Sequence, residues 1–167
     1  MARLGETDRI VQQLKQAVEG ESWTGPALYD LLRRIDATTA AARPLPGANS
    51  IWTLVRHLAA TNDLVRRRID GGPHADRVPA ELDFPPPPEH PTAEDWRRTV
   101  LEFKASELEL RDAISGFDES RLDEPLMPGG TTAYNNFHGV VQHILYHTGQ
   151  IALLRKAVDG GSTSRDQ

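Results

Sequence analysis

The chain has 167 residues, no cysteine and a formal net charge of −5, with a pI of about 5.7. Its length favours a single domain with a substantial core, and the lack of cysteine excludes disulfides, thiolate nucleophiles and sulfur-ligated metals. The acidic balance argues against a nucleic-acid-binding surface, and neither a signal peptide nor a long apolar run is visible. We therefore expect a cytoplasmic protein that binds neither nucleic acid nor a membrane.

The N-terminal part of the chain contains one amphipathic helix followed by a broken segment. Apolar residues recur at helical spacing between about Glu6 and Glu19, and Gly20 ends this pattern. Gly25 and Pro26 then interrupt the chain, and Pro26 can open a short helix at its first turn. Residues 42–48 carry two prolines and are expected to form a loop.

A second long helix is predicted from Asn49 or Ser50, either of which is a good N-cap, to Asp70 before a pair of glycines. Its apolar face includes His57, whose neighbours on that face offer few hydrogen-bond partners. A lone histidine in such a place is ordinarily a core residue with a partner rather than a metal ligand. The three arginines at 66–68 point in different directions around the helix and indicate a solvated helix end.

Residues 71–91 form a long proline-rich connection that cannot be helical for most of its length. A connection of this length is uncommon inside a compact domain unless it has a role. A stiff, extended segment can run back along a helix, so the second and third helices can be parallel. His74 and His90 lie in this connection and are left outside the expected site.

The third helix is predicted from Thr92 to about Ser115, with Thr92 and Asp95 forming a capping box and Gly116 closing the helix. Glu107 lies on the apolar face of this helix. It is expected either to extend from the edge of that face into solvent or to reach the metal region as a proton-transfer group.

The fourth helix, Thr131 to Val158, follows a loop at 124–130 and carries a pair of histidines, His143 and His147. Residues i and i+4 of a helix lie on one face, so both imidazoles point the same way and can share one metal ion. Ile144 and Ile151 are expected at the edge of the core-facing stripe, whose other members are Asn136, Val140, His143, His147, Gln150 and Leu154. Such a pair also occurs without a metal, and a third ligand is required. His57 is the natural choice.

These elements predict an all-α fold, a four-helix bundle in one domain over residues 1–159. Metal sites are commonly built in the core of such bundles from facing helices. Residues 160–167 contain no apolar side chain and are expected to form a disordered tail.

Two stretches resemble the DinB-like or YfiT-like metalloenzymes, which are also similar to the metal-binding domain of mycothiol-dependent maleylpyruvate isomerase and to the bacillithiol transferases. One is NSIWTLVRHLAATNDLV, which begins at Asn49 and contains a single histidine. The other is GVVQHILYHTGQIALLRK, which begins at Gly139 and is similar to the family pattern of two histidines followed by Gly, Gln and Ile. The segment Trp23–Pro26 and the long connection extend the likeness over most of the chain.

The resemblance implies that His57, His143 and His147 are the metal ligands. It implies a divalent metal ion, nickel or zinc, and an up-down-down-up bundle with a long crossover between helices 2 and 3. It also implies a homodimer. The family shares only part of its name with a DNA polymerase, and no nucleic acid is expected as a partner.

Three neutral imidazoles leave coordination positions open for water or substrate, as in catalytic sites. We therefore expect a metal-dependent enzyme, a thiol S-transferase or a hydrolase, that activates a low-molecular-weight thiol or water for attack on a small electrophile. Gln150, Asn136 and Glu107 are candidates for orienting or proton-transfer groups. A non-catalytic metal-binding or stress-associated module, with a closed site completed by Glu107, is the alternative. A metal-free bundle with hydrogen-bonded histidines is the third interpretation.

Overall fold

The computed structural model describes residues 4–20, 22–72 and 75–163, and the regular structure within these ranges is helical. Four helices are long: α1 (Glu6–Glu19), α4 (Ile51–Ile69), α6 (Ala93–Ser115) and α7 (Ala133–Thr163). The short elements are α2 (Leu28–Leu32), α3 (Ala37–Ala41), α5 (Ala80–Asp83) and the 3₁₀ turn η1 (Glu119–Arg121). The described ranges contain two isolated bridges and no strand, which confirms the all-α prediction. None of these helices combines the length and apolarity needed to span a bilayer.

Side-chain caps explain where the long helices begin. The hydroxyl of Ser50 accepts a hydrogen bond from the backbone N–H of Thr53, and that of Thr92 accepts from Asp95, each at 3.1 Å. These caps satisfy N–H groups that have no partner within the helix. The sequence pattern therefore places both starts correctly. The helix α7 ends later than expected, at Thr163, while residues 164–167 of the expected tail lie outside the described residues.

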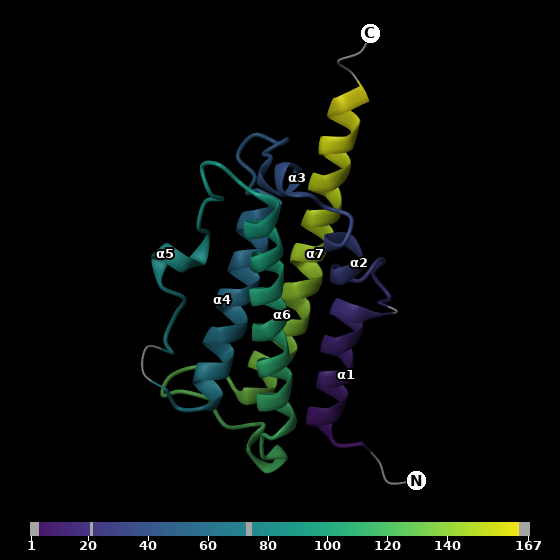
Figure 1. Cartoon of the computed structure of the whole chain (residues 1–167). Helices are drawn as coiled ribbons and strands as arrows, with labels where there is room; N and C mark the ends of the chain where they lie inside the picture. The colour runs from purple at the N-terminus through teal and green to yellow at the C-terminus, as the bar shows by residue number, and fades with distance from the viewer. Residues whose placement is uncertain (1–3, 21, 73–74, 164–167) are drawn as a thin grey trace.

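The four long helices contact one another in a ring. The helix α4 packs against α6 and α7, and α1 packs against the same two helices. Figure 1 shows α1 and α7 running upward in the view and α4 and α6 running downward. The helices α4 and α7 are therefore neighbours with opposite directions, and side chains from both can meet between them.

The crossover that connects α4 to α6 runs back along α4, with α5 lying beside the middle of that helix (Figure 1). Its path is fixed by hydrogen bonds to α4. The guanidinium of Arg68 donates to the backbone carbonyls of Ala75 and Asp76, both at 2.8 Å. This return path lets α4 and α6 run in the same direction, and it places α5 next to the part of α4 that carries His57.

The buried side of α7 is rotated relative to the expected stripe. Phe137, Ile144 and Ile151 are fully buried, whereas His143 and Gln150 are only partly buried. The two isoleucines thus lie at the centre of the core rather than at its edge. The reason is that α7 packs against both α1 and α4, so the apolar side turns between them and the histidine side borders α4. The histidine side consequently lies at the boundary of the core, where His147 is buried and His143 is partly buried.

Candidate metal centre

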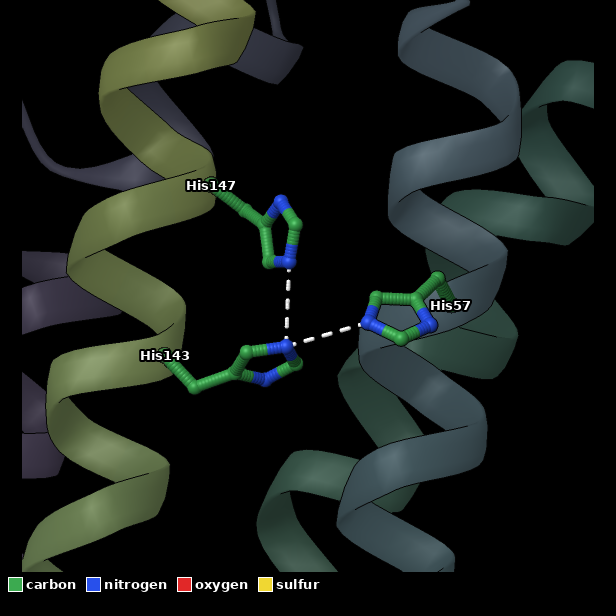
Figure 2. Close-up of side chains that lie close together, drawn as sticks. All are labelled: His57, His143 and His147. Carbon is green, nitrogen blue, oxygen red and sulfur yellow. Dashed lines mark hydrogen bonds between the residues drawn. The ribbon is translucent and has the colours of Figure 1, made fainter. Parts of the chain in front are cut away.

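Three histidines converge between α4 and α7 (Figure 2). His57 comes from α4, and His143 and His147 come from successive turns of α7. The Nε2 atom of His143 lies 3.0 Å from Nε2 of His57 and 3.0 Å from Nε2 of His147. One ligand atom from each ring lies within 4.8 Å of the other two, so a single ion could contact all three.

The ring of His57 is fixed from its outer side by the crossover. Its Nδ1 lies 2.6 Å from the backbone carbonyl oxygen of Asp83 and 2.9 Å from the carboxylate Oδ1 of the same residue. Both oxygens are acceptors, so Nδ1 carries the proton and Nε2 has a free lone pair. Phe84 stacks on this ring with a centroid separation of 4.0 Å and an interplanar angle of 14°. His57 is 7% exposed.

His147 is fixed in the same tautomer by its own helix. Its Nδ1 lies 2.7 Å from Oε1 of Gln150, one turn further along α7. The amide oxygen accepts, so Nδ1 is the protonated nitrogen and the lone pair is again on Nε2. Burial leaves only 5% of His147 exposed.

The lone pairs of His57 and His147 both point to one atom, Nε2 of His143. A ring nitrogen has a single in-plane position, which holds either one proton or one lone pair. Nε2 of His143 therefore cannot form a linear hydrogen bond with both neighbours at 3.0 Å. Its Nδ1 is buried without a hydrogen-bond partner. Hydrogen bonding among the rings thus leaves the cluster incompletely satisfied, and an unsatisfied buried polar group is costly.

The donor set fits a divalent metal ion. Metal–imidazole bonds of about 2.05 Å, at angles between about 90° and 109°, separate the nitrogen atoms by about 2.9–3.3 Å. The two Nε2–Nε2 distances of 3.0 Å fall within this range. With Nδ1 of His143 protonated, each of the three rings would have its lone pair on Nε2, and these lone pairs could bind one ion. His57 and His147 also have the outer hydrogen-bond partners that metal-bound histidines usually have.

Burial keeps the two histidines of α7 uncharged. Burial, followed by the neighbouring rings of His147 and His57, lowers the pKa of His143 to about 4. Burial also lowers the pKa of His147, against the opposing effect of the Gln150 hydrogen bond. Both imidazoles are therefore uncharged near neutral pH, which is the state that a metal ion requires.

The metal-free protein is expected to lose stability in acid because of His143. The unfolded chain binds a proton at the ordinary histidine pKa of 6.5, whereas the folded chain does so only near pH 4. Protonation thus favours unfolding, and the free energy of unfolding decreases as the pH falls from about 6.5 to 4. Between pH 7 and 4.5, chelator-treated wild type is expected to lose about 1–2 kcal/mol more than His143→Leu in urea denaturation. Equal losses would contradict the lowered pKa.

The structure separates the three expected orienting residues. Gln150 lies in the site, bonded to His147. Asn136 does not: its amide oxygen accepts from Arg68 at 2.9 Å and its amide nitrogen donates to the backbone carbonyl of Thr132 at 2.8 Å. Asn136 thereby ties the start of α7 to the end of α4.

Glu107 occupies neither of its two expected positions. It is fully buried, so it does not extend from the edge of α6 into solvent. Its carboxylate lies 2.8 Å from Nε of Arg111, whose Nη2 donates to Glu19 at 2.6 Å. Burial, only partly opposed by Arg111, raises the pKa of Glu107 to about 7. The ion pair with Arg111 explains how a carboxylate is tolerated here, among residues of α6 and α1.

Sequence reasoning missed Asp83 and Phe84, which contact His57 from the crossover. The only local signal is that an acidic and an aromatic residue interrupt a proline-rich stretch. Tyr146 was also missed. Its ring contacts His147 edge-on at 5.0 Å and is 64% exposed, so it stands at the solvent side of the cluster.

These observations define an all-α protein with a candidate metal centre of three imidazoles drawn from two neighbouring helices. The sequence model of the DinB superfamily matches residues 22–151, more than half of the chain and a stretch that includes all three histidines. The chain belongs to the DinB superfamily.

Structural comparison supports the fold. A conserved protein from Enterococcus faecalis superimposes with a TM-score of 0.70, at 17% sequence identity, over 95% of this chain and 99% of the other. Among curated proteins, none matches the chain.

Proposed function

We propose that the protein is a metal-dependent enzyme that activates a low-molecular-weight thiol or water for transfer to, or hydrolysis of, a small electrophile. The observation that carries this proposal is the convergence of three Nε2 atoms, with outer bonds at His57 and His147 that direct their lone pairs toward the same point. Resemblance to the thiol-transferring relatives supports the transferase branch, and general metal chemistry supports the hydrolase branch.

His57, His143 and His147 would hold the ion, and three imidazoles suit either nickel or zinc. When bound, a divalent ion of this kind supplies a Lewis acid that favours the deprotonated form of water or a thiol near neutral pH. Among the described residues the cluster offers three ligands, so positions would remain for exchangeable groups. This is the arrangement expected of a catalytic rather than a closed structural site.

The residues around the cluster orient the ligands and restrict water. Gln150 and Asp83 hold the rings of His147 and His57 from behind, and Phe84 covers one face of His57. The half-exposed rings of Phe84 and Tyr146 border the cluster on its solvent side, which suits a small substrate with an apolar part. Because the chain has no cysteine, a sulfur nucleophile would have to be a substrate.

The non-catalytic alternative is less well supported. This alternative requires a closed site in which Glu107 supplies a fourth ligand. The carboxylate of Glu107 is instead paired with Arg111 on the same helix. Without that ligand, three histidines alone do not close a tetrahedral site.

Other features of the proposal remain predictions. We interpret the four long helices as an up-down-down-up bundle, supported by their directions in Figure 1. A homodimer is proposed from family resemblance, and the absence of nucleic-acid binding from the acidic composition. A cytoplasmic location also stays a proposal.

The proposal predicts that tag-free protein carries about one equivalent of divalent metal and that its cobalt form responds to thiols. Because open positions allow a thiolate to bind, 2-mercaptoethanol is expected to change the cobalt absorption spectrum and to add a sulfur-to-cobalt charge-transfer band. Ethylene glycol has the same shape without the sulfur and serves as the control.

The possible results of this titration distinguish thiol transfer from hydrolysis and from a structural site. A charge-transfer band with the thiol and none with the glycol favours thiol transfer. A cobalt form that is unchanged by the thiol but binds small anions favours hydrolysis. A cobalt form that responds to neither is evidence for a closed, structural site and would count against catalysis.

A further inference from the structure

Besides connecting α4 to α6, the crossover supplies two residues that contact the histidine cluster. Asp83, the last residue of α5, meets Nδ1 of His57 with two different oxygens, at 2.6 Å from its main chain and 2.9 Å from its side chain. The following residue, Phe84, lies parallel to the same ring. Asp83 and Phe84 thus contact both the Nδ1 edge and one face of the His57 ring. Asp83 is 26 residues from His57 in sequence.

This contact selects the form of the imidazole that can bind an ion. A free neutral histidine distributes its proton between its two nitrogens, and only the Nδ1–H form leaves Nε2 available. Two oxygen acceptors at Nδ1 stabilise that form. A carboxylate has a further effect, because its charge increases the basicity of the opposite nitrogen, as in the carboxylate–histidine pairs of zinc sites.

Asp83 is suited to this role by its position. Its side chain is partly exposed, and among the contacts of the described residues its carboxylate has His57 as its ion-pair partner. It approaches from the outer side of the ring, opposite to Nε2, so it does not compete for the ion. Its short helix packs directly against α4, which fixes the approach.

We propose that Asp83 is a positioning residue of the metal centre and that the crossover segment is therefore part of the site. Through Asp83, the affinity for metal depends on how the crossover lies against α4. This inference rests on the proposed metal function.

The test compares zinc affinity in three variants by competition with a chromophoric chelator. Asp83→Ala removes the side-chain acceptor and its charge, and it is expected to weaken zinc binding about 10-fold. This is the low end of the usual 10- to 100-fold effect, because the main-chain carbonyl remains. Asp83→Asn keeps an acceptor oxygen and is expected to recover part of the loss. Glu81→Ala removes a carboxylate from the same short helix that is not among the hydrogen-bond, ion-pair or ring partners of His57 in the described residues, so it should bind zinc as the wild type does.

A second readout uses the metal-free proteins, so that it does not depend on metal binding. The ¹⁵N chemical shifts of the His57 ring give the fraction of each tautomer. The Nδ1–H form should dominate in the wild type and in Glu81→Ala, and its fraction should fall in Asp83→Ala. Far-UV circular dichroism identifies any variant that has lost its helices.

The proposal requires both effects. It is overturned if Asp83→Ala binds zinc like Glu81→Ala, or if affinity falls while the tautomer of His57 is unchanged, since that would indicate a purely structural role. If the wild type binds no zinc, the proposed metal function fails, and the tautomer measurement alone decides whether Asp83 positions His57.

Discussion

Replacing His143 with alanine is expected to lower zinc affinity by more than about 100-fold, which exceeds the usual effect of losing an outer hydrogen-bond partner. Nε2 of His143 is the atom shared by both 3.0 Å contacts, so its removal leaves a gap at the centre of the cluster. Two imidazoles would remain where catalytic zinc sites normally use three protein ligands. Elemental analysis of purified protein and chelator competition would measure the loss.

His90→Ala is the matched control for this variant. His90 is an exposed histidine of the crossover that takes no part in the cluster, so its removal changes the histidine content without affecting the site. Both variants should keep the helical circular dichroism of the wild type. Retained zinc binding in His143→Ala, or an equal loss in His90→Ala, would contradict the assignment of the three ligands.

Replacing Arg111 with methionine is expected to lower the free energy of unfolding by about 3–5 kcal/mol at pH 8, because it leaves the fully buried carboxylate of Glu107 without its counter-charge. Methionine retains much of the apolar stem, so the loss is electrostatic rather than a packing defect. Arg98→Met on the same helix removes an exposed ion pair with Asp95 and should cost no more than about 1 kcal/mol.

The cost of Arg111→Met should depend on pH. Glu107 has a raised pKa of about 7 in the folded protein, against an ordinary value of 4.5 in the unfolded chain. Its contribution to stability is therefore complete below pH 4.5 and is lost as the pH rises through 7. At pH 5.5 the carboxyl is already largely protonated in the folded state, so removing Arg111 costs less than at pH 8.

Urea denaturation at both pH values would measure this difference. In the double variant Glu107→Gln/Arg111→Met no buried charge remains, and the additional loss at pH 8 should disappear. An equal cost of Arg111→Met at pH 5.5 and pH 8 would show that Glu107 is not the group responsible.

The helices with local signals were predictable from the sequence. Ser50 and Thr92 cap their helices as expected, and α1 has the predicted bounds. These features depend on hydrogen bonds between residues three or four positions apart, which a single sequence displays directly. The spacing of His143 and His147 is of the same kind, so their common face could also be predicted.

Features that depend on packing between helices were less accessible. The periodicity of α7 gives an apolar side, but only contacts with both α1 and α4 determine that Ile144 and Ile151 lie at its centre. The pair of Glu107 with Arg111, four residues further along α6, has a local signal, but the full burial of Glu107 depends on distant segments, which bring Tyr29 and Glu19 close enough to interact with it electrostatically. Asp83 reaches His57 only because the crossover runs back along α4, and no local pattern predicts that path.

The sequence separation within the histidine cluster has a consequence for unfolding. His57 and His143 are 86 residues apart, so an ion held by both would act as a reversible cross-link that closes about half of the chain into one loop. By the chain-entropy relation for disulfides, closing a loop of this length restricts the unfolded ensemble by about 4–5 kcal/mol. A chelator would open this link and a disulfide reductant would not. The protein would thus gain the stability that a covalent cross-link provides, without cysteine. This gain would depend on the concentration of free metal.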